Sequence, residues 1–218
     1  MNVLNANTKQ VFEKLAQLEL IKEFTFIGGT ALALQLEHRI SEDLDFCLWA
    51  ENPRQVLVGI NEKKILESLT KEFDSVTIKY TAPNQIDLVV DEVKVTFFAD
   101  NENKKPIGKY IPYKGQITLP DPITIAAMKI GAMFDRIKFR DYYDLYAISL
   151  AGATLHEIIE SSISFKPYLE PKLITIMLTN GNRIDDEEIG HLSPKYKVTK
   201  AEIENFFKEK VAEWVSAQ

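Results

Sequence analysis

One stretch of the chain, Gly28 to Phe46, limits the fold more than any other: GGTALALQLEHRISEDLDF. An apolar run (FTFI) leads into its glycine pair, which predicts a strand followed by a turn where the backbone approaches a phosphate closely. Asp43 and Asp45 follow on a predicted strand, where alternation points both side chains to one face. Two carboxylates so close repel each other unless a divalent cation lies between them. The stretch therefore predicts chemistry on nucleotide phosphates.

Composition narrows the class of protein further. The chain has 218 residues and a formal net charge of −6, which allows a sizeable core and argues against a surface coated for nonspecific nucleic-acid binding. Cys47 is the only cysteine, so an intrachain disulfide is excluded and a reducing compartment is favoured. We see no apolar run of membrane-spanning length and no signal-peptide core, so we expect a cytoplasmic protein without a membrane partner.

Hydrophobic periodicity predicts a mixed architecture in the first half of the chain. The order is helix, strand, helix, strand, helix and then three strands, which is an α/β layout. The predicted elements occupy residues 8–20, 24–27, 31–36, 44–49, 61–73, 76–80, 86–90 and 93–98. Asp91-Glu92 separates the last two strands and predicts a hairpin turn.

The second half is predicted to be helical. Pro120-Asp121-Pro122 interrupts the strand pattern, and helices are predicted over residues 123–134, 142–150, 155–161, 171–178 and 199–215. Residues 101–115 are cationic and glycine-bearing, which predicts a solvated loop. We therefore expect an α/β domain over residues 1–120 and a helical C-terminal domain over residues 121–218.

A second cluster of charged residues lies in MKIGAMFDRIKFRDYYDLYAI, residues 128–148. On a continuous helix, Lys129 and Arg136 share one face, and Arg140 falls nearly below them. Asp141 and Asp144 are three apart and are also neighbours on a helix. Two interpretations remain open: ordinary salt bridges on a solvated face, or a phosphate contact by Lys129, whose apolar neighbours demand a counter-charge.

Together these segments resemble the AbiEii/AbiGii-type nucleotidyl transferases of the polymerase-β-like superfamily. The segments that carry the resemblance are GGTALAL (28–34), HRISEDLDF (38–46), Lys129 and RDYYDL (140–145). The resemblance implies a nucleotidyltransferase-like mixed sheet with flanking helices, an α/β (α+β) fold, followed by a helical C-terminal region. It also implies an enzyme that moves NMP from an NTP to an acceptor and releases pyrophosphate, with Mg²⁺ as its cofactor. Because the family includes abortive-infection and toxin–antitoxin toxins, a cognate antitoxin is a further implied partner.

The resemblance also assigns roles to individual residues. Those assigned to nucleotide binding are Gly28, Gly29, Thr30, Arg39, Ser41, Lys129 and Arg136. Those assigned to catalysis are Asp43, Asp45, Lys129, Asp141 and Asp144. Asp43 and Asp45 are the expected Mg²⁺ ligands, and Lys129 is expected to neutralise the triphosphate. Asp141 or Asp144 is expected to orient that lysine or to activate the acceptor, whereas Arg39 either contacts phosphate or pairs with a carboxylate.

One position departs from the superfamily pattern. Polymerase-β-like enzymes usually carry a third carboxylate on a later strand, and the strand over residues 93–98 offers Thr96 there instead. Either the base comes from Asp87, Asp141 or Asp144, or catalysis is weakened.

The acceptor is open at this point. An RNA acceptor such as a tRNA end is one expectation, supported by a basic patch of Lys104, Lys105, Lys109, Lys114, Arg136, Lys138 and Arg140. A protein side chain is another. The alternatives are transfer to a small molecule of the antibiotic type, and a catalytically silent module that binds nucleotide or protein.

Overall fold

The computed structural model describes residues 3–52, 57–180 and 189–217. It divides the chain into two compact units, and each is described by itself. The sheet unit consists of Met1–Gln35, Ile40–Lys105 and Lys109–Asp121. The helical unit consists of Leu36–Arg39, Pro106–Gly108 and Pro122–Gln218. The domain boundary predicted after residue 120 remains a prediction, and the chain leaves the sheet unit for the last time one residue later.

The order of elements predicted for the first half of the chain is confirmed. The elements are α1 (Ala6–Leu15), a 3-10 turn η1 (Glu19–Glu23), β1 (Thr25–Ile27), α2 (Gly28–Leu36), β2 (Leu44–Trp49), α3 (Glu62–Glu72), β3 (Val76–Ala82), β4 (Gln85–Val90) and β5 (Val93–Asp100). The first helix is shorter than predicted because it ends at Leu15 and the chain continues into η1. The glycine pair opens α2 directly, so the turn after β1 is the helix N-terminus itself.

The five strands form one mixed sheet in the order β1-β2-β5-β4-β3. β2 and β5 pair in parallel, and the other neighbours pair antiparallel. The predicted hairpin turn is confirmed between β4 and β5, where Asp91 and Glu92 have φ of 43° and 67°. Positive φ at both central residues matches the right-handed twist of the flanking strands, which explains a two-residue connection.

Alternation along the strands sorts the sheet into an apolar row and a polar row. The apolar row is Phe26, Phe46, Phe97 and Ile86, paired across β1, β2, β5 and β4 and fully buried. The next row is the acid row, which consists of Ile27, Asp45, Thr96, Asp87 and Tyr80, paired across all five strands. Because neighbouring rows point to opposite faces, the acid Asp45 lies on the face opposite the aromatic core.

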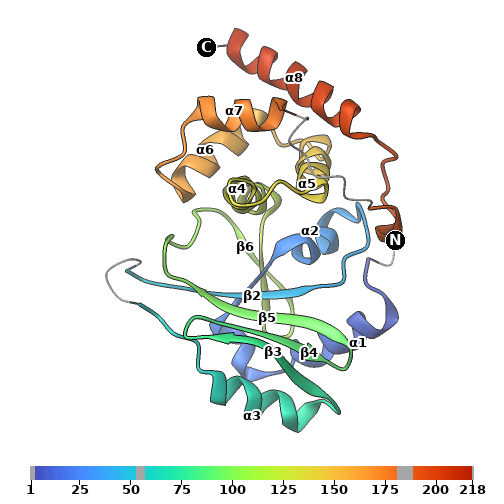
Figure 1. The fold of residues 1–218 in the computed structure, drawn as a ribbon, viewed down its shortest axis with the longest axis vertical. Helices are drawn as coiled ribbons and strands as arrows, with labels where there is room; N and C mark the ends of the chain where they lie inside the picture. The colour runs from blue at the N-terminus through green and yellow to red at the C-terminus, as the bar shows by residue number, and fades with distance from the viewer. Residues whose placement is uncertain (1–2, 53–56, 181–188, 218) are drawn as a thin grey trace. The chain divides into compact units, whose positions relative to one another are not determined.

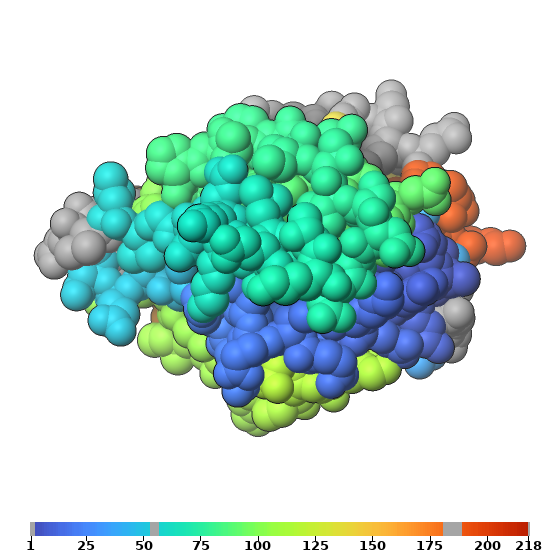
Figure 2. All heavy atoms as spheres, turned by 90° about the horizontal axis from the view of Figure 1, so that it is seen from below, coloured from blue at the N-terminus to red at the C-terminus, as the bar shows by residue number. Residues whose placement is uncertain are grey.

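Helices cover both faces of this sheet, with α2 on one side and α3 on the other (Figure 1). On the apolar side, Phe12 of α1 lies 5.3 Å from Phe26 between ring centroids. The helix α3 buries Ile65 and Leu69 on its inner side and lies next to the N-terminal segment at the surface (Figure 2). Burial of these rings and aliphatic side chains supplies the main stabilisation of the sheet unit, at about 1.5–3 kcal/mol for each.

The prediction of a loop over residues 101–115 is wrong for its last residues, because a second hairpin begins at Tyr110. It consists of β6 (Tyr110–Lys114) and β7 (Ile117–Pro120). The strand signal was weak because most of β6 is exposed, while the apolar side chains Ile117 and Leu119 of β7 are buried. Gly115 makes the turn at φ +53°, where a Cβ would lie 2.1 Å from the carbonyl oxygen of Ala16.

The helical unit contains the five helices that were predicted. They are α4 (Pro122–Met133), α5 (Phe139–Leu150), α6 (Leu155–Phe165), α7 (Pro171–Thr179) and α8 (Lys200–Ser216), with a short 3-10 turn η3 (Gly190–Leu192) before α8. Among the described residues, no helix is long and apolar enough to span a membrane.

The second charged cluster is divided between two helices, as the predicted helices over residues 123–134 and 142–150 imply, so the face that a continuous helix would give Lys129, Arg136 and Arg140 does not form. The chain is not helical between Met133 and Phe139, so Lys129 lies on α4, Arg136 lies in the connection and Arg140 lies on α5. The break needs neither glycine nor proline, since the connecting residues are FDRIK, and the second helix begins three residues earlier than predicted. The charged residues of this cluster therefore come from two helices and the segment between them.

Candidate functional site

The centre of the candidate site in the sheet unit is the carboxylate of Asp45 beside Gly28. Asp45 lies on β2 next to Ile27 of β1, and the chain turns at Gly28 with φ +82° into α2. A Cβ at this glycine would lie 2.6 Å from Asp45 Oδ2. Glycine is therefore required twice, for the left-handed backbone and for the space that the carboxylate occupies.

Asp43 lies just before β2, not within it as predicted. Both Asp43 and Asp45 are partly exposed, whereas Leu44 between them is fully buried, so the two carboxylates share the accessible side of the chain. This is the arrangement that the one-residue spacing predicted.

Thr30 and Ser41 hold the acid segment against α2. The Thr30 hydroxyl lies 2.7 Å from the Ser41 hydroxyl and also donates a hydrogen bond to the main-chain carbonyl of Asp43. Thr30 is 1% exposed and Ser41 is 6% exposed. Their hydroxyl groups thus position the backbone around Asp43, and the half-buried Gly28 and Gly29 are the accessible part of the turn.

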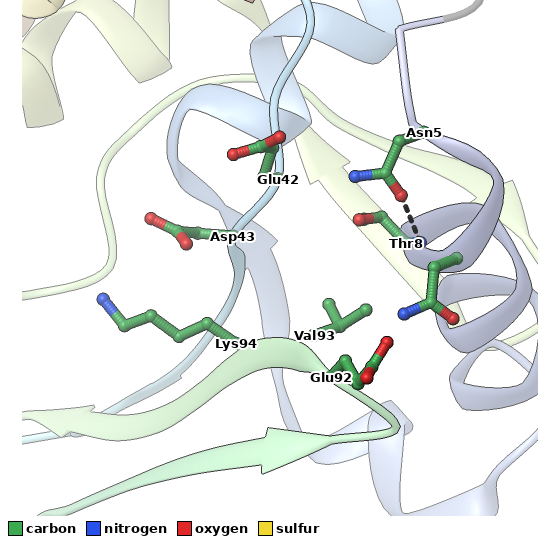
Figure 3. A pocket seen from close by; sticks show the side chains of 8 residues that line it. Asn5, Thr8, Glu42, Asp43, Glu92, Val93 and Lys94 are labelled. Atoms are coloured by element: carbon green, nitrogen blue, oxygen red, sulfur yellow. Dashed lines mark hydrogen bonds between the residues drawn. The ribbon is translucent and has the colours of Figure 1, made fainter.

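A small pocket of about 250 Å³ adjoins Asp43 on the side of β5. It is lined by Asn5, Asn7, Thr8, Glu42, Asp43, Glu92, Val93 and Lys94. The side chain of Lys94, at the start of β5, extends alongside Asp43 in this pocket (Figure 3). Lys94 belongs to no recognisable motif, but its position two residues before Thr96 on the same strand places it on the same face as Thr96 and Asp45.

The position of the missing third carboxylate is fixed by the strand register. Thr96 on β5 is the direct partner of Asp45 on β2, so a carboxylate there would adjoin the acid pair. Asp87 on β4 is the next residue in this row, paired with Thr96, and its Oδ1 accepts a hydrogen bond from Gln85 at 2.9 Å. Two strand spacings, about 10 Å, therefore separate the backbones at Asp45 and Asp87.

In the helical unit, Asp144 is the centre of a buried charge network. Its carboxylate accepts from Arg39 Nε at 2.7 Å and Nη2 at 2.9 Å, and Lys129 Nζ lies 2.6 Å away. His38 Nε2 lies 2.7 Å from Asp144 Oδ1. Burial raises the pKa of Asp144, but Arg39 and Lys129 outweigh it and hold that pKa well below its usual range. A carboxylate held this way is a poor proton acceptor.

Lys129 finds its counter-charge inside this unit. It is 7% exposed, and its ammonium bonds Asp141 Oδ1 at 2.7 Å as well as Asp144. Burial lowers the pKa of Lys129, yet Asp144 and Asp141 together raise it, so the lysine keeps its charge. The network thus pairs two cations, Arg39 and Lys129, with two carboxylates.

His38, to which the sequence assigned no role, belongs to this network as well. It is fully buried, its ring stacks on Tyr143 at 5.9 Å, and its main-chain carbonyl accepts from the Tyr143 hydroxyl at 3.0 Å. Burial lowers the pKa of His38 against the opposing effect of Asp144, so the folded protein favours the neutral ring. The missed signal was the HR pair directly before the acid segment.

Arg136 lies at the edge of the network. Its Nε is 3.4 Å from Asp141 Oδ2, and its side chain is 52% exposed. Of the three cations predicted to bind nucleotide, Arg136 is thus the accessible one. Arg39, for which the sequence allowed either a phosphate or a carboxylate partner, pairs with the carboxylate of Asp144. Among the residues that the structure describes, no three His, Cys, Asp or Glu side chains are placed to hold a metal ion together.

A mixed sheet with a glycine-opened helix, an acid pair at the start of β2 and a following helical region defines the fold of a nucleotidyltransferase. The chain has this fold in common with two solved structures. It resembles MenT4, a nucleotidyltransferase toxin of Mycobacterium tuberculosis H37Rv, with a TM-score of 0.58 at 16% identity over 94% of this chain and 84% of that one. It also resembles a candidate nucleotidyltransferase of Helicobacter pylori, with a TM-score of 0.53 at 16% identity over 96% of this chain and 94% of that one.

Residues 10–166 match the model of the nucleotidyl transferase AbiEii toxins of type IV toxin–antitoxin systems, and the chain belongs to this family. It is also 26% identical to an uncharacterized protein of Aquifex aeolicus over 99% of both chains. The resemblance drawn from the GGTALAL, DLDF and RDYYDL segments is therefore confirmed at the level of family, fold and enzyme class.

Proposed function

We propose that this protein is a toxin that transfers NMP from an NTP to an RNA acceptor, with Mg²⁺ as cofactor. The observation that carries the proposal is the contact between Asp45 and Gly28, which puts a candidate metal ligand against the first residue of α2. Helix N-termini favour anions because their first N–H groups have no partner within the helix. The start of α2 can therefore bind a triphosphate, and Asp45 beside it can bind the cation that the triphosphate requires.

The donor set at Asp43 and Asp45 fits Mg²⁺. Two partly exposed carboxylates offer hard oxygen ligands, and Mg²⁺ is commonly bound by one or two carboxylates together with substrate phosphates and water. When bound, the cation neutralises charge that develops on the leaving pyrophosphate.

The chain's own groups have separate roles in the proposed reaction. An acceptor hydroxyl oxygen forms a bond to the α-phosphorus while the bond to the pyrophosphate oxygen breaks, and the hydroxyl proton passes to a base. Gly28 and Gly29 receive the phosphates, and Thr30 and Ser41 fix the backbone around Asp43. Asp87 is the proposed base, because it lies in the same row as Asp45. Asp144 is a poor candidate, because Arg39 and Lys129 hold its pKa well below the usual range.

For Lys129 and Arg136 we propose the nucleotide-binding role that the family resemblance implies. Asp141 and Asp144 hold the Lys129 ammonium at 2.7 and 2.6 Å, which supports a fixed position for this charge. Arg136 is half exposed and can reorient toward a phosphate. A cognate antitoxin is a further proposed partner, since the family consists of type IV toxin–antitoxin toxins.

The test is transfer of label from each α-³²P-labelled NTP, in the presence of Mg²⁺, to total bacterial RNA. The wild type should label one RNA size class, and the Asp43→Asn, Asp45→Asn double variant should not, with an unchanged unfolding transition. Label on protein or on an antibiotic-type small molecule, without label on RNA, would contradict the RNA acceptor. Undiminished transfer by the double variant would contradict the catalytic site.

A second candidate function rests on Thr96. Because Thr96 stands directly beside Asp45, the site lacks a carboxylate where polymerase-β-like enzymes carry one. This favours, as the alternative, a silent module that binds nucleotide or protein. Nucleotide binding without transfer to any acceptor would support it.

A further inference from the structure

The direction from which the acceptor approaches follows from the donor side of the sheet unit. In phosphoryl transfer, the attacking and leaving oxygens lie roughly in line on opposite sides of the phosphorus. Gly28, at the start of α2, flanks Asp45 on the β1 side, so the pyrophosphate leaves toward β1 and α2. The acceptor must then arrive from the other side of Asp45, which is the side of β5.

The acid row continues on this acceptor side to the edge of the sheet. From Asp45 it passes Thr96 on β5 and Asp87 on β4 and ends at Tyr80 on the edge strand β3. Side chains of one row point to one face of a sheet. Three strand spacings put Tyr80 about 14 Å from Asp45 along the row, a span of a few nucleotides.

The ring of Tyr80 is exposed and packs against no other aromatic ring among the described residues. It is 52% exposed, and its side chain has no hydrogen bond or ring contact with any residue that the structure describes. Two exposed lysines lie near this row: Lys94 in the pocket at Asp43, and Lys79, which is unpaired at the register irregularity between Ile78 and Tyr80. Neither lysine has an ion-pair partner within the described part of the chain. An exposed ring with nearby cations is the combination that binds single-stranded nucleic acid.

We infer that the acceptor is a single-stranded RNA end that crosses β5 and β4, with a base stacked on Tyr80 and a backbone phosphate at Lys94. This rests on the proposed function and specifies the residues that bind its acceptor. The strand register sets the distance between Tyr80 and Asp45, and therefore the distance between the stacked base and the reacting hydroxyl. Lys94 offsets part of the negative charge of Glu42 and Glu92 at the entrance to this path.

The test compares Tyr80→Ala, Tyr80→Trp and Lys94→Gln with the wild type in transfer to the labelled RNA. Tyr80→Ala should raise the KM for RNA about 10- to 100-fold and leave the KM for the NTP unchanged, while Tyr80→Trp should restore it. Lys94→Gln should raise the same KM and lower the salt dependence of RNA binding by about 0.7 in log–log slope. Tyr113→Ala, at a ring of similar exposure on β6, and Lys71→Gln, on α3 at the opposite face, are the matched controls.

Anisotropy of a labelled single-stranded RNA oligonucleotide provides a second readout that does not need transfer. If the wild type transfers nothing, the proposed function fails, but weaker RNA binding by Tyr80→Ala, restored in Tyr80→Trp, would still support the stacking site. An unchanged KM and RNA affinity in Tyr80→Ala would overturn the inference. A loss of RNA affinity in Tyr80→Trp as large as in Tyr80→Ala would also overturn it. The same holds if Tyr80→Ala changes only the labelling of protein or the oligomeric state.

Discussion

Two residues show how single side chains set the chemistry of each unit. At Gly28 the absence of a side chain makes room for the Asp45 carboxylate at the start of α2. At Asp144 one carboxylate pairs with both Arg39 and Lys129 and bonds His38, and all four side chains are buried. Removing one member of such a network leaves an unpaired buried charge, which commonly costs about 3–5 kcal/mol.

Substitution of Gly28 by alanine should separate backbone strain from the contact with Asp45. Gly28→Ala and Gly152→Ala both force a side chain into positive φ, and each should lose about 1–3 kcal/mol of unfolding free energy. Only the Cβ at position 28 must displace a carboxylate, since nothing lies within 4 Å of a Cβ at position 152. Nucleotide transfer should therefore fall in Gly28→Ala alone, measured beside urea unfolding. Equal transfer by the two variants would contradict a role for this contact.

The buried His38 predicts how stability depends on pH. Its pKa is lowered in the folded protein, so below the ordinary value of about 6.5 the unfolded chain binds a proton that the folded chain does not. His38 therefore makes the unfolding free energy fall as the pH falls from about 6.5 toward its lowered pKa. His38→Gln should flatten this slope, by up to about 1.4 kcal/mol per pH unit, in urea unfolding at several pH values.

The control for His38 is His156→Gln, the same change at an exposed histidine on α6. This variant should keep the slope of the wild type. An equal slope in His38→Gln and the wild type would show that His38 is not the group responsible.

At the scale of elements, the parallel pairing of β2 with β5 decides which residues meet the acid pair. The pairing brings together strands that are separated in the chain by α3, β3 and β4. Its register puts Thr96, and no other residue of β5, directly beside Asp45. A shift of one residue would instead turn the acid row toward the aromatic core.

Thr96→Asp should create the third carboxylate and make stability depend on Mg²⁺. Without the cation, the new charge is 8% exposed beside Asp45, and the melting temperature should fall because like charges repel. Added Mg²⁺ binds the folded state and should raise the melting temperature more than it does in the wild type. Thr77→Asp, at an exposed position of β3, should show no such gain. The same Mg²⁺ effect in both variants would contradict the register argument.

At the scale of the whole molecule, family membership and charge bear on what the toxin acts upon. The chain belongs to the AbiEii nucleotidyl transferase toxins, and its net charge is −6. A negatively charged protein does not attract RNA over its whole surface, so recognition has to come from local cations and exposed rings. For the proposed RNA acceptor we therefore expect a narrow contact with one RNA end, not an extended interface.

Expression of the wild type in a bacterial host should arrest growth. The Asp43→Asn, Asp45→Asn variant, produced to the same level, should not, because toxicity depends on transfer at the acid pair. Colony counts after induction measure the difference, with immunoblotting as the control for protein level. Growth arrest by both proteins would dissociate toxicity from catalysis.

Much of the fold was predictable because the signals that carry it are local. Alternation located β2 and β5, periodicity located the helices, and Asp91-Glu92 marked the hairpin between β4 and β5. Signals failed where tertiary packing overrides local preference. The mostly exposed β6 lacked a clear apolar alternation, so its residues were predicted to be a loop.

The sequence by itself determined the family, the order of elements, and the side chains with the chemistry of the candidate site. Only the tertiary structure decided which of them meet. It pairs Thr96 with Asp45, turns His38 and Arg39 toward Asp144, and gives Lys129 its counter-charge. The physical reason is that strand register and burial join residues far apart in the chain, and single-residue patterns do not contain that information.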